Sequence, residues 1–213
     1  MAFSTGKLVF CLVVAVAVCP PQPASALDPR YPDWPCQQLK VPEISIASVW
    51  TGPSIEDIKT APEDPAQADL VARLAARRTP IEEARKLIAD DVTGTDQQKQ
   101  EKAKALFAAL YSTLNAQRDQ VMNGIERFSR KQKAMANQIR EETRKIREIQ
   151  DAPSASQTES EELATRLSWQ TRIFEDRQKS TAYVCDVPVV IEKRLFDLAN
   201  AIQNTLKAGP QPM

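Results

Sequence analysis

The chain has 213 residues, carries 28 basic and 28 acidic side chains, and contains no histidine. This length suits one domain, and the even charge balance argues against a nucleic-acid-binding protein, which normally has a net basic surface. Without histidine, the commonest general base and the commonest metal ligand are missing. The sequence also has no nucleophile elbow, no glycine-rich phosphate loop and no calcium-loop spacing, so we predict no catalytic residue, no cofactor and no metal site.

Residues 1–26 have the features of a secretory signal peptide that is cleaved after Ala26. Lys7 supplies the positive start, and an apolar run follows at 8–19, which is too short to span a bilayer of ~30 Å. The alternatives are an uncleaved anchor and a lipid attached at Cys19, although no lipobox precedes that cysteine. No second apolar run of membrane length follows. The sequence therefore predicts an exported, periplasmic protein without a membrane span.

Two of the four cysteines lie within the signal peptide, and the mature chain keeps Cys36 and Cys185. An even pair in an oxidising compartment predicts one disulfide. The alternative is a redox or metal site. Two distant cysteines without a CxxC motif and without histidine do not suit it.

Residues 27–65 form a segment rich in proline and aromatic residues, and seven prolines exclude a long helix there. We expect an extended arm whose apolar side chains lie on a helical surface. Trp34 is expected to pack over the disulfide, Trp50 is also expected to pack, and a short turn is expected at 54–57.

Two modest helices are predicted next, at 66–78 and from Pro80 to about Asp91. Thr79 has the position of an N-cap for the second helix, since Pro80 follows it and Glu82 is the third residue after it. Gly94 ends this second helix.

A much longer helix is predicted from residue 96 to about 150, where there is one glycine, Gly124, and no proline. Its apolar residues recur mostly at intervals of three and four, with Gln117, Gln132 and Glu142 at the remaining positions of the stripe. That is the spacing of a coiled-coil seam. Such a helix would be roughly 80 Å long, and so narrow a stripe can be buried only against one or two partner helices.

Residues 151–156 are the predicted turn, and a capping box at Ser156 and Glu159, or at Thr158 and Glu161, starts the return helix. This helix is expected to break at 185–188, where Asp186 can cap its continuation to about residue 207. Residues 209–213 are predicted to be a loose tail.

The predicted fold is therefore all-α: a long antiparallel, coiled-coil-like hairpin, with two shorter helices and the proline-rich arm packed on its proximal half. Counting outward from the turn places Trp169 near Ile139 and Cys185 near Gly124, where a glycine would permit close approach. The helical bundle would cover 66–208. Its distal part, about 129–180, would project as a two-helix coiled coil.

The distal part contains the candidate contact residues for a partner. Trp169 lies where the least core is expected to cover it. Basic side chains on the first long helix of the hairpin could face acidic side chains on the return helix. The alternative is a solvated surface whose ion pairs contribute little to stability. These charged candidates are Arg140, Arg144, Lys145, Arg147, Glu159, Glu161 and Glu162.

These features favour a non-enzymatic exported scaffold or adaptor that binds another exported or envelope protein through its hairpin. A homodimer is a variant, because the polar seam residues limit how well one hairpin buries its stripe. A small all-helical enzyme of the chorismate mutase kind, acting on an anionic metabolite, is an alternative that rests on Arg73, Arg77, Arg78 and Glu82. A holdase-like chaperone is another.

Overall fold

The computed structural model describes residues 28–56, 58, 62, 64–151 and 157–207. Within these ranges the chain forms helices and connecting segments, and no strand. The helices are α1 (Ile46–Val49), α2 (Pro65–Ala75), α3 (Ile81–Asp91), α4 (Asp96–Gln150) and α5 (Gln157–Lys207). The predicted signal peptide, Ser156 of the expected capping box and the predicted tail at 209–213 lie outside the described residues.

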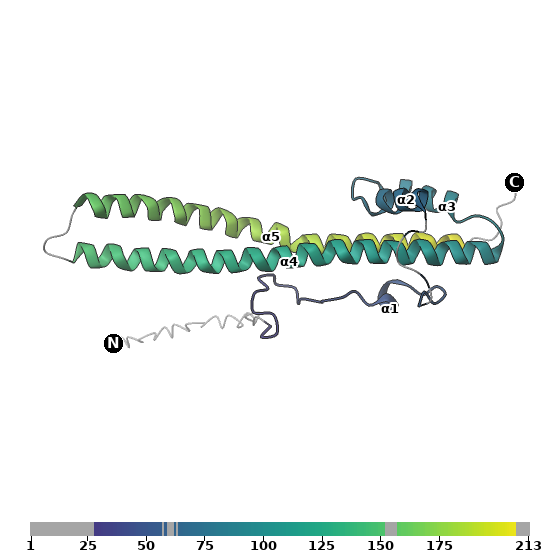
Figure 1. The fold of residues 1–213 in the computed structure, drawn as a ribbon, viewed down its shortest axis with the longest axis horizontal. Coiled ribbons are helices and arrows are strands. Elements are labelled where there is room, and N and C mark those ends of the chain that lie inside the picture. Colours follow the sequence, from purple (N-terminus) through teal and green to yellow (C-terminus); the bar gives the residue numbers. More distant parts are fainter. Residues whose placement is uncertain (1–27, 57, 59–61, 63, 152–156, 208–213) are drawn as a thin grey trace, which may run out of the picture.

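The two long helices α4 and α5 run antiparallel, side by side, as the predicted hairpin (Figure 1). Helix α4 begins at a capping box, in which the Thr95 hydroxyl accepts from the Gln98 amide N–H and the Gln98 side chain accepts from the Thr95 amide N–H. It ends at Gln150, as predicted from the sequence. The predicted all-α hairpin with shorter helices is confirmed.

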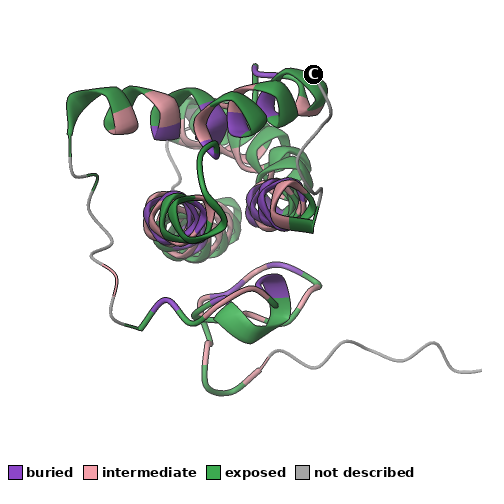
Figure 2. Cartoon of the chain, turned by 90° about the vertical axis from the view of Figure 1, so that its right-hand side faces the viewer, coloured by how far each residue is buried: buried purple, intermediate pink, exposed green. Residues whose placement is uncertain are grey.

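Three layers make up one end of the hairpin (Figure 2). The long helices form the middle layer, α2 and α3 cover one side, and the arm with α1 lies on the other side (Figure 1). We call this end the proximal half, with α4 residues 96–128 and α5 residues 181–207. The distal half, with residues 129–151 and 157–180, consists of the two long helices alone.

Two side-chain contacts fix the pairing of the helices in the distal half. The Gln132 side-chain amide donates to the Phe174 carbonyl oxygen at 3.3 Å, and the Gln170 amide donates to a Glu142 carboxylate oxygen at 3.2 Å. Both contacts lie within about one helical turn of the predicted register. Gln132 and Glu142 are therefore seam residues, as their spacing predicted.

Helix α5 is continuous through Pro188, so the predicted break at 185–188 is wrong. Proline removes one helical hydrogen bond, the one that the Val184 carbonyl would accept. On the same turn, the Cys185 carbonyl accepts a hydrogen bond from the side-chain amide of Gln38 in the arm. Contact with the arm thus supplies backbone hydrogen bonding beside the proline, which the sequence pattern of α5 alone does not reveal.

One local prediction for the connecting segments is also wrong. Thr79 is not the N-cap of α3, because Pro80 occupies that position and the Thr79 hydroxyl donates to the Arg73 carbonyl oxygen at 2.7 Å. The hydroxyl therefore provides a hydrogen bond to a carbonyl in the last turn of α2 instead. The turn expected from Ser54 onward is present, because the Ile58 amide N–H donates to the Ile55 carbonyl oxygen at 3.0 Å; the helical turn α1 is an additional element that precedes it.

Gly124 does not serve a close approach between helices. A methyl group at this position would meet only the Arg127 guanidinium, at 3.8 Å, which is an ordinary contact. The disulfide nevertheless lies at the predicted level of α4, since Cys185 packs with Met122 and Ile125.

The apolar core is confined to the proximal half and the arm. Trp50 from the arm stacks on Phe107 of α4, with ring centroids 4.2 Å apart. Buried apolar residues from all five helices surround this pair. In the described distal half, only Ser129 and Glu142 are buried, and both are polar. The two halves of one hairpin are thus stabilised in different ways.

Candidate functional site

The disulfide joins the arm to α5 at the border between the two halves. Cys36 and Cys185 are bonded, with their Cα atoms 5.6 Å apart, and this confirms the predicted pair. Trp34 packs beside the bridge and is buried, as expected, and its indole N–H donates to the Gln38 carbonyl oxygen at 2.7 Å. Because Gln38 in turn donates to the Cys185 carbonyl, the bridge, the tryptophan and the glutamine form one fixed clip.

Arg118 of α4 contacts the next part of the arm. Its side chain is only 2% exposed, which is unusual for a charged residue. Its guanidinium donates to Glu192 of α5 at 2.6 Å, and to the carbonyl oxygens of Val41 and Pro42 at 2.5 and 3.3 Å. A buried guanidinium needs such partners, since an unpaired buried charge is strongly destabilising. Nothing in its sequence neighbourhood distinguishes Arg118 from the other charged residues of α4.

Tyr111 of α4, about two helical turns before Arg118, contacts the next residues of the arm. Its hydroxyl donates to the Ile44 carbonyl oxygen at 2.6 Å and contacts a Glu43 carboxylate oxygen at 3.3 Å. Burial, together with the nearby negative charge of Glu43, raises the pKa of the Tyr111 phenol. The phenol therefore remains protonated, as its hydrogen bond to the carbonyl requires.

An ionic contact ties the beginning of the arm to the first turns of the distal half. Asp33 accepts from Lys133 at 3.0 Å and from Arg130 at 3.2 Å. Hydrogen bonds from these two cations lower the pKa of the Asp33 carboxyl. The arm therefore reaches just beyond the disulfide, and the distal half continues without it.

The distal seam contains polar groups that are only partly satisfied. One oxygen of Glu142 accepts from Gln138 and Gln170, at 3.0 and 3.2 Å. The second Glu142 oxygen is buried without a hydrogen-bond partner among the described residues, as are the side-chain oxygens of Gln132 and Gln170. Such groups lower stability, because they lose their water without gaining a partner.

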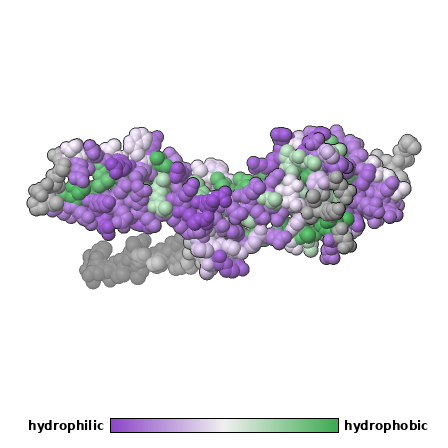
Figure 3. Space-filling model, viewed as in Figure 1, coloured by the Kyte–Doolittle hydropathy of each residue, from purple (hydrophilic) through white to green (hydrophobic). Residues whose placement is uncertain are grey.

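Exposed apolar side chains concentrate on α5. Ten large hydrophobic residues in the described chain are exposed, and seven of them belong to this helix: Trp169, Ile173, Tyr183, Val184, Val189, Val190 and Phe196. On the face shown in Figure 3, the distal half is largely hydrophilic with small apolar patches. Trp169 is 60% exposed, and Ile173, one turn further on, is also exposed. The structure thus leaves uncovered the tryptophan that the sequence pointed to.

The charged candidates lie on the distal helices, and the ion pairs of Arg144 stay within its own helix. Arg144 contacts Glu141 at 2.6 Å and Glu148 at 3.5 Å. Arg140 donates to Asn137, three residues before it on α4. These contacts are short-range pairs on an exposed helical surface, which contribute little to stability.

The structure gives the surroundings of two of the residues behind the enzyme alternative, Arg73 and Arg77. Arg73 forms an exposed ion pair with Glu83 at 3.5 Å. Arg77 borders a hollow of about 350 Å³ together with Arg194. The Arg194 guanidinium is already engaged, because it donates to the carbonyl oxygens of Leu74 and Thr79 at 2.6 to 2.9 Å.

The described residues contain no group of three or more potential metal-binding side chains, and none of their helices is long and apolar enough to cross a membrane. No protein-family model, no curated protein and no solved structure matches the chain.

Proposed function

We propose that the protein is an exported, periplasmic adaptor that binds another exported or envelope protein through the distal half of its hairpin. The observation that carries this proposal is the contrast in burial. The distal half has a coiled-coil seam, yet no apolar residue in its described part is buried. A partner helix or surface laid along this half would bury the seam residues and Trp169 together.

The chemistry of the surface suits a protein partner. Trp169 and Ile173 provide an apolar centre, and the exposed charged residues Arg172 and Asp176 lie next to them on α5, three positions after each. An aromatic anchor inside a polar rim is the usual anatomy of a protein interface. The proximal half, with its apolar core and disulfide, would support the projecting distal half that carries this surface.

Site-specific photocrosslinking in cells tests the proposal. A photoreactive phenylalanine at position 169 should give a discrete adduct with one other envelope protein. The same residue at Leu39, which is 70% exposed in the arm, is the matched control and should give none. Adducts of equal yield at both positions, or at neither, would contradict the proposal, and an adduct of twice the chain mass would identify a homodimer instead.

Two variants then separate the tryptophan face from the charged tip. Trp169→Ala should weaken the purified complex about 30-fold, which corresponds to the loss of one aromatic anchor of about 2 kcal/mol. Deletion of residues 140–165 removes the charged tip but leaves Trp169 in place. If the partner is lost only on deletion, the charged tip is the contact surface; if it is lost only with Trp169→Ala, the tip is dispensable.

A further inference from the structure

A hollow of about 350 Å³ lies between the turn that follows α2 and the two long helices, and its volume is at the lower end of the usual range for small-molecule sites. Its lining contains no carboxylate among the described residues, and its polar members are Arg77, Arg194, Gln117 and Gln120. The two guanidiniums can only donate hydrogen bonds, and the two amides can donate as well. The hollow therefore suits a ligand that accepts hydrogen bonds.

Arg77 is the exposed cation of this hollow. Its side chain forms no ion pair and no hydrogen bond with any other residue that the structure describes. Its backbone is nevertheless held in place, because the Thr79 amide N–H donates to the Ala76 carbonyl oxygen at 3.1 Å across the turn, and Arg194 donates to the Thr79 carbonyl oxygen at 2.8 Å. A free guanidinium on a fixed backbone lowers the entropic cost of binding.

Arg194 of α5 places a second cation beside the same hollow. Three of its five N–H groups donate to the carbonyl oxygens of Leu74 and Thr79, which leaves one N–H on each terminal nitrogen without an acceptor among the described residues. Burial lowers the pKa of Arg194, and the nearby Asp197 carboxylate partly offsets this. An anion in the hollow would stabilise the charged form of Arg194 and would reduce the repulsion between the two cations.

The remaining lining of the hollow is apolar. Val121 of α4 and Val187 of α5 pack against the core but stay partly exposed, so a hydrocarbon group can reach them. Such a group would remove apolar surface from water. The hollow therefore combines an apolar floor with two cations, which favours an amphipathic anion over a small hydrated one.

The hollow also gives a role to a polar residue of the seam. The spacing of apolar residues in α4 places Gln117 at a seam position, yet its side chain is exposed. It lines the hollow together with Gln120, and neither side chain forms a hydrogen bond with other described residues. Both amides are thus available to donate to a ligand.

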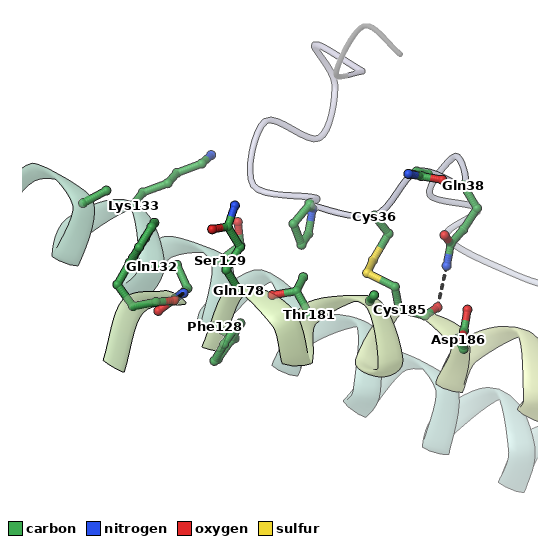
Figure 4. Close-up of a pocket in the computed structure, with 15 residues that line it drawn as sticks. Cys36, Gln38, Phe128, Ser129, Gln132, Lys133, Gln178, Thr181, Cys185 and Asp186 are labelled. Carbon is green, nitrogen blue, oxygen red and sulfur yellow. Dashed lines mark hydrogen bonds between the residues drawn. A yellow bond between two sulfur atoms is a disulfide. The ribbon is translucent and has the colours of Figure 1, made fainter. Parts of the chain in front are cut away.

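The hollow beside the disulfide differs in its charged groups (Figure 4). The one cation among its described lining residues, Lys133, already donates to Asp33 at 3.0 Å, and Asp186 adds a carboxylate to the lining. An anion there would compete with Asp33 and would be repelled by Asp186. The hollow beside Arg77 is therefore the better site for an anion.

We propose that the hollow beside Arg77 binds an amphipathic organic carboxylate, with its carboxylate on the guanidiniums of Arg77 and Arg194 and its hydrocarbon group on the apolar floor. The two oxygens of a carboxylate can accept from the two N–H groups of Arg194 that lack an acceptor, and guanidiniums are well matched to such groups. The site lies in the proximal half, so it is separate from the proposed partner surface and does not depend on the adaptor role.

NMR titration of the full chain without its predicted signal peptide tests the proposal with hexanoate, hexanamide and acetate. Hexanamide lacks the charge, and acetate lacks the hydrocarbon chain. Hexanoate should shift the side-chain signals of Arg77, Gln117 and Gln120, and should bind about tenfold more tightly than either of the other two probes. The proposal is overturned if millimolar hexanoate gives no saturable shift, or if hexanamide or acetate binds equally well.

Two neighbouring arginines provide a matched pair of variants. Arg77 and Arg78 are both exposed in the same turn, but Arg78 is not among the residues that line the hollow. Arg77→Gln should weaken hexanoate binding about tenfold without changing hexanamide binding, whereas Arg78→Gln should leave both nearly unchanged. Circular dichroism verifies that both variants are folded. An equal loss in the two variants would mean that positive charge in general, and not this hollow, attracts the carboxylate, and would also overturn the proposal.

Discussion

The proximal and distal halves are built from the same two helices, but they bury different kinds of residues. In the proximal half, α4 and α5 share an apolar core with α1, α2, α3 and the arm. In the distal half, the described seam buries only Ser129 and Glu142. One continuous helix can therefore run from a region with a buried apolar core into a region in which few side chains are buried.

This difference indicates where each half derives its stability. A helix in isolation is marginal in water, and packing of an apolar face supplies most of its stability in proteins. The proximal half has such packing on both sides of the hairpin (Figure 2). The distal half has one helix against one helix, and should open at lower free energy than the proximal half.

The largest expected effect concerns the clip at the border of the halves. Reduction of the Cys36–Cys185 bridge, which spans 149 residues of sequence, should lower the free energy of unfolding by about 3–5 kcal/mol. Urea unfolding with and without reductant measures this change. A Cys36→Ser, Cys185→Ser variant is the control and should not respond to reductant. An effect below about 1 kcal/mol would mean that the arm is held by its other contacts alone.

A matched pair of leucine substitutions compares the two halves directly. Leu110 is fully buried in the proximal core, whereas Leu167 on the distal part of α5 is only partly buried. Leu110→Ala should lower the free energy of unfolding by about 3–5 kcal/mol, and Leu167→Ala by about 1 kcal/mol. Hydrogen exchange should place the second loss in distal amides. Equal losses would show that the distal seam is as well packed as the core.

The hairpin was predictable because its determinants are local. Three features can be recognised in the sequence itself: the intervals of three and four between apolar residues, the absence of proline in residues 96–150, and the pair of cysteines that follows residue 26. The seam positions of Gln132 and Glu142 follow from the same periodicity, and so does the approximate register.

The features that the sequence did not reveal arise from contacts between distant segments. In the sequence, Arg118 resembles the other charged residues of a long helix. Only the folded structure places Val41 of the arm and Glu192 of α5 next to its guanidinium. Helix α5 continues through Pro188, and one turn before the proline the Cys185 carbonyl accepts from Gln38 of the arm, nearly 150 residues away in sequence. A hollow beside the disulfide is lined by residues of the arm, α4 and α5, so no single stretch of sequence could indicate it.

The arm contact of Tyr111 predicts a pH effect that is specific to the proximal half. The folded protein raises the pKa of this phenol, whereas the unfolded chain ionises near pH 10. The stabilising contribution is therefore complete below about pH 10 and is lost as the pH rises through the folded pKa. Tyr111→Phe should lower the free energy of unfolding by about 1 kcal/mol at neutral pH and should flatten the alkaline decline.

The exposed Tyr183 is the matched control for this pH effect. Tyr183→Phe should leave the free energy of unfolding at neutral pH nearly unchanged, because the Tyr183 side chain is 78% exposed. Unfolding curves from pH 8 to pH 11 compare the two variants. An identical alkaline decline in wild type and in Tyr111→Phe would rule out Tyr111 as its source.

The smallest expected effect tests whether polarity limits the distal half. Glu142 and Gln170 contact each other across the seam, yet each has a buried oxygen without a partner among the described residues. Replacing both with leucine should raise the free energy of unfolding by about 1 kcal/mol, since two apolar groups replace a poorly satisfied polar pair. Thermal unfolding and hydrogen exchange in α4 and α5 measure the gain. If the proposed partner then binds less tightly while the protein is more stable, the polar pair serves recognition. If the free energy of unfolding falls, the polar pair is already well satisfied, and the contrast between the halves lies in their apolar packing alone.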